Sequence, residues 1–277
     1  MGSGIAQVAA SAGYATILFD VSAEAVQRAG EKLNKDLSSL VDKGKMTTDK
    51  KEDILNKIQF TSELKHCQAD VVIEAIVERA DIKISLFNQL AEFNTEQTIF
   101  ASNTSSLSIT SLAKDIQHPQ RVAGLHFFNP APLMKLVEVV KGEQTSDEVI
   151  QQLVNLTKVL GKVPVVCKDS PGFIVNRVAR PYYIESLRIV EEGSASYEVI
   201  DRLMESIGFK MGPFKLMDLI GNDVNYAVSC SVYGQLGRPE RLKPSYIQQE
   251  KVEKGELGKK TGKGYYDYGS LSPDRGT

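Results

Sequence analysis

Short apolar runs alternate with helical segments along residues 1–168, and this alternation limits the fold more than any other feature of the sequence. The runs are rich in branched and aromatic residues and have the length of buried strands. Strands that alternate with helices form a largely parallel sheet with helices on both faces, so we expect an α/β domain here. The predicted strands are Thr16–Asp20, Ala69–Ile76 (interrupted by Glu74), Thr98–Ala101, Val122–Phe127, Leu136–Val140 and Val163–Cys167.

The sequence pattern changes after Lys168. Ser170-Pro171-Gly172 breaks regular structure, and only helical periodicity follows it. We therefore place a domain boundary at Lys168 and expect residues 169–277 to form an all-helical domain. Its predicted helices are Ile174–Glu192 (with a kink at Pro181), Ala195–Ile207, Phe214–Gln235 and Pro244–Lys254.

Helices are also expected within the first domain. Residues 22–58 are polar and rich in lysine, and Gly44 with Thr47-Thr48-Asp49 indicates two helices that form a hairpin arm. A solvated face is the simplest interpretation of most of these lysines. The remaining predicted helices are Met1–Ala10, Asp81–Asn94, one that starts near Ile109, and Ser146–Leu160.

Composition and charge narrow the partners and the compartment. The formal net charge of -2 gives no reason to expect nucleic acid or a membrane surface as partner. No apolar stretch has the length of a membrane span, and the first basic residue is Arg28, so no signal peptide is expected. Cys67, Cys167 and Cys230 lie far apart and form no metal-ligand pattern. We expect three reduced thiols, no metal site and a cytoplasmic protein.

The stretch from Arg121 to Val140 holds the main catalytic candidate. His126 ends one predicted strand and Glu138 lies inside the next, with Pro130 and Pro132 between them. If the strands lie side by side, the carboxylate can orient the imidazole and leave its other nitrogen free to accept a proton. A buried histidine with a satisfied hydrogen bond, beside a surface Glu138, is the alternative interpretation.

The N-terminal residues resemble the second half of a dinucleotide-binding βαβ unit. A helix that starts at Gly2 is followed by a strand that ends in Asp20, where an acid of such units binds the ribose hydroxyls. We interpret Gly2 as the third glycine of a Gly-x-Gly-x-x-Gly loop and Met1 as an internal methionine. A first strand and two glycines are then expected upstream.

The predicted strand Thr98–Ala101 leads into a loop of polar residues, Ser102–Ser106. Its hydroxyl and backbone N–H groups could bind polar ligand atoms. Alternatively, Ser105 or Ser106 caps the following helix.

These features together resemble the 3-hydroxyacyl-CoA dehydrogenase family over nearly the whole chain. The matching segments are 1–6 (Met-Gly-Ser-Gly-Ile-Ala), 74–78 (Glu-Ala-Ile-Val-Glu), 101–106 (Ala-Ser-Asn-Thr-Ser-Ser), 124–130 (Gly-Leu-His-Phe-Phe-Asn-Pro), 168–177 (Lys-Asp-Ser-Pro-Gly-Phe-Ile-Val-Asn-Arg), 211–214 (Met-Gly-Pro-Phe) and 258–262 (Gly-Lys-Lys-Thr-Gly). The resemblance implies a Rossmann-like domain without its first strand, followed by the family's helical C-terminal domain.

The resemblance also implies catalytic roles for four residues. His126 resembles the general base that removes the 3-hydroxyl proton while hydride passes from C3 to NAD, and Glu138 resembles its orienting partner. Ser105 and Asn176 resemble the residues that hold the 3-oxygen of the acyl-CoA substrate.

Other positions resemble binding residues of the family. Lys43 resembles a contact to the phosphates of CoA, and Asp20 resembles the ribose ligand. A carboxylate at position 20 would repel a 2′-phosphate, which favours NAD over NADP. The remaining NAD contacts implied by the resemblance are Met1, Gly2, Glu78, Lys83, Ser105, Asn129 and Lys260.

The substrate and the activity leave alternatives open. Residues 177–183 and 218–221 resemble the bacterial branch of phenylacetate and short-chain acyl-CoA catabolism, which suggests 3-hydroxyadipyl-CoA or 3-hydroxybutyryl-CoA as substrate. A homodimer through the helical domain is also implied. The first alternative function is a non-catalytic or truncation-inactivated protein of the same fold. The second is a hydroxyacid dehydrogenase with a lysine base, which would need a lysine where this chain has Asn176-Arg177.

Overall fold

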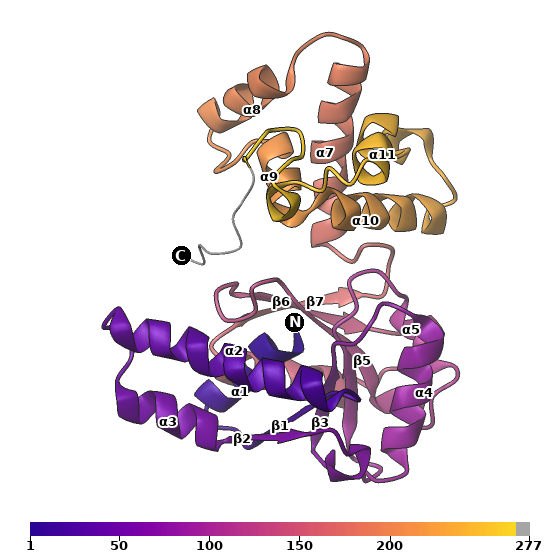
Figure 1. Cartoon of the computed structure of the whole chain (residues 1–277). Coiled ribbons are helices and arrows are strands. Elements are labelled where there is room, and N and C mark those ends of the chain that lie inside the picture. Colours follow the sequence, from indigo (N-terminus) through magenta and orange to yellow (C-terminus); the bar gives the residue numbers. More distant parts are fainter. Residues whose placement is uncertain (270–277) are drawn as a thin grey trace. The chain divides into compact units, whose positions relative to one another are not determined.

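A computed structural model describes residues 1–269 of the chain, which divides into two units, Met1–Ser170 and Pro171–Thr277 (Figure 1). Residues 270–277, at the end of the predicted second domain, lie outside the described residues.

The first unit has the predicted alternation of helices and strands. A strand absent from the prediction, β2, follows the arm, where Ile58-Gln59-Phe60-Thr61 is too short a run to stand out beside a helix. The elements are α1 (Gly2–Ser11), β1 (Thr16–Phe19), α2 (Ala23–Asp42), α3 (Thr48–Asn56), β2 (Ile58–Thr61), β3 (Val71–Glu74), α4 (Ala80–Ala91), β4 (Ile99–Ser102), α5 (Ile109–Ala113), β5 (Val122–Phe127), β6 (Leu136–Lys141), α6 (Asp147–Val159) and β7 (Val163–Lys168).

Side-chain caps explain where several of these helices begin. Ser22 accepts a hydrogen bond from the N–H of Ala25 at the start of α2, and Thr47 and Ser146 do the same for α3 and α6. Ser108 caps α5 by accepting from the N–H of Ser111. The alternative that Ser105 or Ser106 caps this helix is therefore wrong, which leaves both residues in the loop before it.

The strands form a five-stranded sheet in the order β3-β4-β5-β6-β7 and a two-stranded sheet of β1 and β2. All pairs are parallel except β5 with β6, so the predicted largely parallel sheet is confirmed. In the antiparallel pair, Gly124 is opposite Val140 and His126 is opposite Glu138. Among the described residues, no strand pairing joins β1 to β3.

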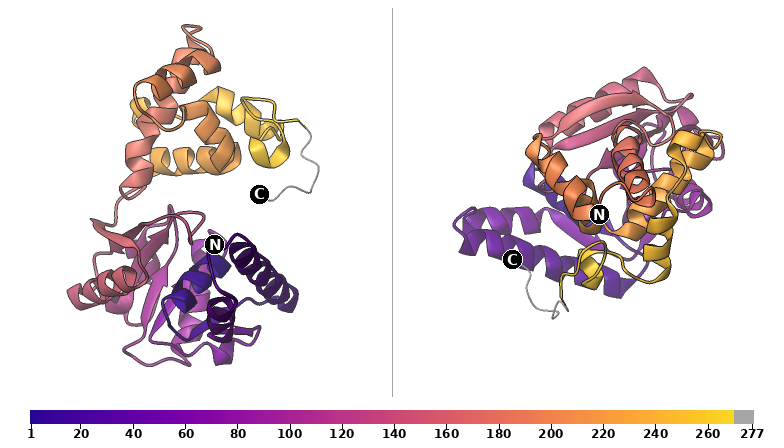
Figure 2. Two further views of the ribbon diagram at one scale, coloured as in Figure 1. Left: turned by 90° about the vertical axis from the view of Figure 1, so that its left-hand side faces the viewer. Right: turned by 90° about the horizontal axis from the view of Figure 1, so that it is seen from above.

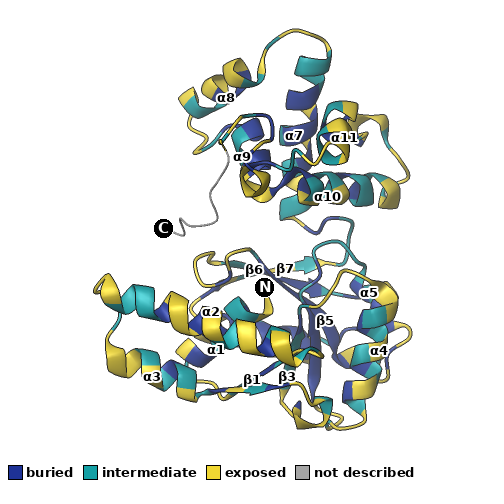
Figure 3. Ribbon diagram, viewed as in Figure 1, coloured by how far each residue is buried: buried dark blue, intermediate teal, exposed yellow. Residues whose placement is uncertain are grey.

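The three central strands β4, β5 and β6 are buried almost throughout, so their side chains are enclosed on both faces of the sheet, whereas β7 is largely exposed (Figure 3). On one face, Ala101, Leu125 and Val139 pack in a core with residues of α1 and α6, among them Val8 and Leu153. Neighbouring positions along the strands point to the opposite face. There the ring of Phe100 contacts that of Phe87 in α4, at 5.3 Å between centroids. His126 and Glu138 belong to this second face by the same alternation.

The arm predicted for residues 22–58 is present as α2 and α3, which lie side by side (Figure 2). Leu33 and Leu37 of α2 and Ile54 of α3 are fully buried in a core that they share with β1 and β2. One face of the arm therefore packs on the two-stranded sheet.

The second unit is helical, as predicted, with Pro181 inside its first helix. The prediction of one helix over Phe214–Gln235 is wrong, because the chain breaks at Gly221, whose φ of 103° lies in a region that favours glycine. The N–H of Asn222 instead donates to the carbonyl of Leu257. The helices are α7 (Val175–Glu191), α8 (Tyr197–Ser206), α9 (Pro213–Ile220), α10 (Asn222–Gln235) and α11 (Tyr246–Glu253).

A buried carboxylate attaches the C-terminal turn of this unit to α9. Asp218 accepts hydrogen bonds from the N–H groups of Tyr265 and Tyr266 and from the hydroxyl of Tyr268. The approach is so close that a Cβ at Gly264 would lie 2.0 Å from Oδ1 of Asp218. The turn is thus fixed by hydrogen bonds as well as by the burial of Tyr265.

Candidate active site

His126 and Glu138 form a buried pair on neighbouring strands. Nδ1 of His126 lies 2.7 Å from Oε2 of Glu138, and the two residues are 6% and 1% exposed. The expectation of a surface glutamate in the alternative interpretation is therefore wrong. A carboxylate on Nδ1 directs that nitrogen to carry the proton, which leaves Nε2 as an acceptor.

Residues around His126 fix the end of its strand. The N–H of Phe127 donates to the side-chain oxygen of Asn103 at 2.8 Å, and the rings of His126 and Phe128 lie 4.6 Å apart. Two residues earlier, a Cβ at Gly124 would lie 2.7 Å from Cβ of Val140. Glycine at this position therefore allows β5 to lie close to β6, which holds Glu138.

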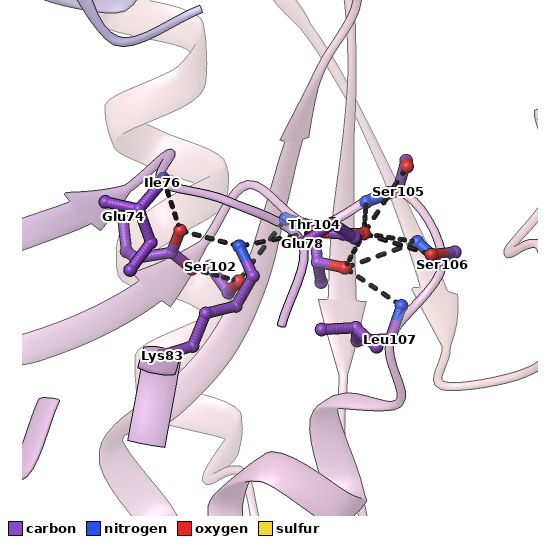
Figure 4. Close-up of polar contacts among 9 residues, drawn as sticks. All are labelled: Glu74, Ile76, Glu78, Lys83, Ser102, Thr104, Ser105, Ser106 and Leu107. Carbon is purple, nitrogen blue, oxygen red and sulfur yellow. Dashed lines mark hydrogen bonds and ion pairs between the residues drawn. The ribbon is translucent and has the colours of Figure 1, made fainter. Parts of the chain in front are cut away.

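The loop after β4 is organised around the carboxylate of Glu78 (Figure 4). Oε1 of Glu78 accepts hydrogen bonds from the hydroxyl of Thr104 at 2.5 Å and from the N–H groups of Ser105 at 3.0 Å and Ser106 at 3.2 Å. The hydroxyl of Thr104 accepts in turn from the N–H groups of Ser106 and Leu107. The loop that carries Ser105 thus depends on two side chains for its shape.

The pKa of Glu78 reflects this arrangement. Burial acts to raise the pKa, but the hydrogen bonds from Thr104, Ser105 and Ser106 and the ammonium of Lys83 together lower it below its usual value. Glu78 therefore holds the loop as a carboxylate at neutral pH.

Lys83 lies in the first turn of α4 and is 1% exposed. Its ammonium is 2.6 Å from Oε1 of Glu74 and 3.2 Å from Oε2 of Glu78. In the sequence, Glu74 interrupts an apolar run, and no role was predicted for it. An acid inside an otherwise apolar strand was the available signal, because a buried carboxylate requires a partner.

The candidate cofactor residues of the first unit lie at the ends of its elements. Asp20 follows β1, is exposed, and accepts from the N–H of Ser22 at 3.0 Å. Met1 is the N-cap of α1 and makes no side-chain cap, and no atom lies within 4 Å of a Cβ built on Gly2. Asn129 is exposed and precedes Pro130 through a cis peptide bond.

These residues fit a dinucleotide. The start of α1 offers backbone N–H groups that no side chain caps and no acid faces in the first turn, which suits a phosphate. The first turn of α1 also packs on the loop after β5, since a Cβ at Gly4 would lie 3.2 Å from Cδ of Pro132. The structure therefore brings Met1 and Gly2 close to the loop that contains Asn129.

Lys162 was not recognised from the sequence, where it looks like a surface lysine before the last strand. Its side chain is buried and its ammonium donates to the carbonyls of Ala131 at 2.6 Å, Met134 at 2.9 Å and Pro132 at 3.3 Å. Burial lowers the pKa of this lysine. It holds the loop after β5 through backbone oxygens, which no sequence pattern reveals.

The other candidates belong to the arm and to the second unit. Lys43 is exposed at the C-cap of α2, on the arm. In the second unit, Asn176 is half-buried in the first turn of α7, where its carbonyl accepts from the guanidinium of Arg180 at 2.9 Å. Lys260 pairs with Asp223, its ammonium lying 2.6 Å and 2.7 Å from the two carboxylate oxygens.

Two kinds of feature are absent from residues 1–269. No helix in this range combines the length and the low polarity needed to cross a membrane. The same range contains no cluster of three or more His, Cys, Asp or Glu side chains that could hold a metal ion.

Comparison with known proteins gives matches along both units. The family model for the NAD binding domain of 3-hydroxyacyl-CoA dehydrogenase matches residues 1–170, and the model for the C-terminal domain of 3-hydroxyacyl-CoA dehydrogenase matches residues 172–268.

Individual proteins are similar over nearly the whole chain. The mitochondrial hydroxyacyl-coenzyme A dehydrogenase of Sus scrofa is 43% identical over 97% of this chain and 88% of its own length. The 3-hydroxyadipyl-CoA dehydrogenase of Escherichia coli is 53% identical, but this chain spans only 57% of its length. The crystal structure of (S)-3-hydroxybutyryl-CoA dehydrogenase from Ralstonia eutropha superimposes with a TM-score of 0.93 at 39% identity, over 98% of this chain and 96% of that one.

Proposed function

The chain belongs to the 3-hydroxyacyl-CoA dehydrogenase family, and on this premise we propose that it oxidises an (S)-3-hydroxyacyl-CoA to the 3-oxoacyl-CoA. Its first unit matches the family's NAD binding domain, so the cofactor is NAD. NAD supplies the hydride acceptor in such a reaction. The observation that carries the proposal is the buried contact between His126 and Glu138.

In the proposed mechanism His126 is the general base. Glu138 engages Nδ1, so Nε2 accepts the proton of the substrate's 3-hydroxyl as the hydride leaves C3. The carboxylate then stabilises the imidazolium that results. Burial of both side chains strengthens this electrostatic support, because few water molecules screen it.

Two polar residues complete the proposed substrate site. We assign Ser105 and Asn176 to the 3-oxygen, and the bonds that Glu78 makes to the loop support a fixed position for Ser105. Lys43, exposed on the arm, is proposed to contact the phosphates of CoA.

The proposed NAD contacts follow from the fit described above. The start of α1, with Met1 and Gly2, would face the pyrophosphate, and Asp20 would accept hydrogen bonds from the adenosine ribose. Glu78, Lys83, Ser105, Asn129 and Lys260 are the other proposed contacts. Lys83 and Lys260 are already paired with carboxylates, so any contact of theirs to NAD would be shared with these acids.

We propose a short-chain or dicarboxylic acyl-CoA as substrate, because the similar proteins are named for 3-hydroxyadipyl-CoA and (S)-3-hydroxybutyryl-CoA. Fatty acid β-oxidation or phenylacetate catabolism would then be the pathway. The cytoplasm is the proposed compartment, because the three cysteines are unpaired, as in a reducing environment.

A homodimer through the second unit is also proposed. Val199, Leu203 and Ile207 recur at every fourth position on and just after α8, and Leu203 and Ile207 are 58% and 64% exposed. Apolar residues at this spacing form a stripe along one face of a helix. A stripe of this kind suits contact with another protein surface.

The proposal is tested by following NADH absorbance after addition of acetoacetyl-CoA or 3-oxoadipyl-CoA to the purified chain. Loss of NADH that depends on the acyl-CoA is expected. NADH binding without turnover of either compound would instead favour the non-catalytic alternative, and NADH binding can be measured separately by fluorescence.

A further inference from the structure

The buried carboxylate of Glu74 has no role in the proposed reaction, although the side chain is fully enclosed. Glu74 ends β3 and is 3% exposed. Its two oxygens face different partners: Oε1 accepts from the ammonium of Lys83 at 2.6 Å and from the N–H of Ile76 at 2.7 Å, and Oε2 accepts from the hydroxyl of Ser102 at 2.7 Å. A buried charge costs free energy of folding unless it keeps all of its hydrogen-bond partners. The groups around Glu74 are therefore constrained to one arrangement.

Both sides of this carboxylate lead to the loop that carries Ser105 (Figure 4). On one side, Lys83 connects Glu74 to Glu78, which accepts from the N–H groups of Ser105 and Ser106. On the other side, the hydroxyl of Ser102 accepts from the N–H of Thr104 at 3.3 Å while it donates to Glu74.

The charges explain why these connections would be rigid. One ammonium lies between two carboxylates, and Lys83 and Glu74 are almost completely shielded from water. Without Glu74, the ammonium of Lys83 would have Glu78 as its only carboxylate partner among these residues. The ammonium would then move toward the carboxylate of Glu78. Any such shift changes the position of the oxygen that holds the loop.

We infer that Glu74 is a positioning residue that sets the conformation of residues 104–107, and so the placement of Ser105, through Lys83 and Glu78 and through Ser102. The consequence for turnover rests on the proposed dehydrogenase function, whereas the consequence for the loop does not. Glu74 touches neither substrate nor NAD in this assignment.

The first measurement is hydrogen–deuterium exchange of the complete chain, which needs no activity. Glu74→Gln keeps the size of the side chain but removes its charge. The amides of Ser105, Ser106 and Leu107 should exchange at least about tenfold faster than in the parent chain, because their acceptors are no longer held in place.

Asp201→Asn is the matched control: Asp201 is also fully buried and accepts from the N–H groups of Phe214 and Lys215, but it belongs to the second unit. This control should leave the loop amides unchanged.

The second measurement is a double-mutant cycle on kcat, at a temperature where all variants are folded. Glu74→Gln should lower kcat about tenfold in the parent chain, since small misplacements of substrate-positioning groups have large effects on rate. In a Ser105→Ala background the same change should lower kcat by less than about twofold, because the residue through which it acts is already lost.

Two outcomes would overturn the inference: unchanged exchange of the loop amides in folded Glu74→Gln, or equal effects of Glu74→Gln on kcat with and without Ser105. If Glu74→Gln does not fold, Ser102→Ala removes only the second connection and must still accelerate exchange at Ser105 and Ser106, whose acceptor Glu78 is left in place. If the loop responds as expected but the parent chain has no dehydrogenase activity, the proposed function fails and the positioning role stands.

Discussion

Oε2 of Glu138 lies 2.7 Å from Nδ1 of His126, and the two residues are direct partners in the antiparallel pair of β5 and β6. The backbone register therefore holds the two side chains together, so their contact does not depend on a flexible loop. This geometry gives the proposed general base a defined tautomer before any substrate binds.

His126→Gln should lower kcat by about 10²–10⁴-fold, the usual contribution of a general base. Glutamine keeps a polar side chain of similar length but has no nitrogen that can accept a proton at neutral pH. Steady-state rates with acetoacetyl-CoA and NADH test this, with NADH binding as the control for folding. Full turnover in this variant would contradict the mechanism.

Glu138→Gln should lower kcat at least about tenfold, and at most as much as His126→Gln does. An amide can donate to Nδ1, which would leave the proton on Nε2, where the substrate proton must be accepted. Comparison of kcat in this variant, in His126→Gln and in the double variant tests the link. If the two effects multiply, the residues act independently and the orienting role is wrong.

The chain should prefer NADH to NADPH, because the exposed carboxylate of Asp20 would face a 2′-phosphate of like charge. Asp20→Asn should lower the ratio of kcat/KM for NADH to kcat/KM for NADPH, mainly because kcat/KM for NADPH rises. A preference of the parent chain for NADPH would show that the ribose assignment is wrong. Asp36→Asn, an acid of the arm outside the proposed site, serves as the control for a general change in charge.

Cys167 should react slowly with alkylating reagents at pH 8. Burial, together with the negative charges of Glu138 and Asp169, raises the pKa of its thiol to about 12. The folded state therefore favours the protonated thiol, and its contribution to stability is complete below the usual pKa of 9.0 and declines as the pH rises from there toward 12. Ultraviolet titration of the thiolate in a Cys67→Ala, Cys230→Ala background measures the pKa, which Glu138→Gln should lower. A pKa near 9 in the folded chain would refute this environment.

Leu203→Asp should convert the proposed homodimer into a monomer, because it places a charge in the apolar stripe of Val199, Leu203 and Ile207. Light scattering coupled to size exclusion measures the mass. Arg202→Asp, on the same helix but outside the stripe, should keep the dimer. A monomeric parent chain would exclude this interface.

Much of the fold follows from the sequence, because buried strands and amphipathic helices leave separate periodic patterns. The family, the α/β class and NAD as cofactor are confirmed. The break at Gly221 escaped prediction because both flanking segments are helical and a single glycine is tolerated within many helices.

The candidate site, like the fold, could be predicted from the sequence only in part. The strand positions of His126 and Glu138 made their contact predictable, since neighbouring strands place side chains in register. The roles of Glu74 and Lys162 depend on partners distant in the sequence. Some of these partners are backbone carbonyls, which every residue has and which the sequence therefore does not mark. Pattern analysis cannot assign such contacts.

The turn that Asp218 holds against α9 has a consequence for how this protein can vary. At Gly258 and Gly264 an added methyl group would overlap the backbone or the carboxylate of Asp218, at 2.3 Å and 2.0 Å. The segment is therefore an integral part of the helical unit, although its composition is basic and rich in glycine. Engineering of this region must preserve glycine at these two positions, while the exposed Lys259 between them is a position where a label or a new charge can be introduced.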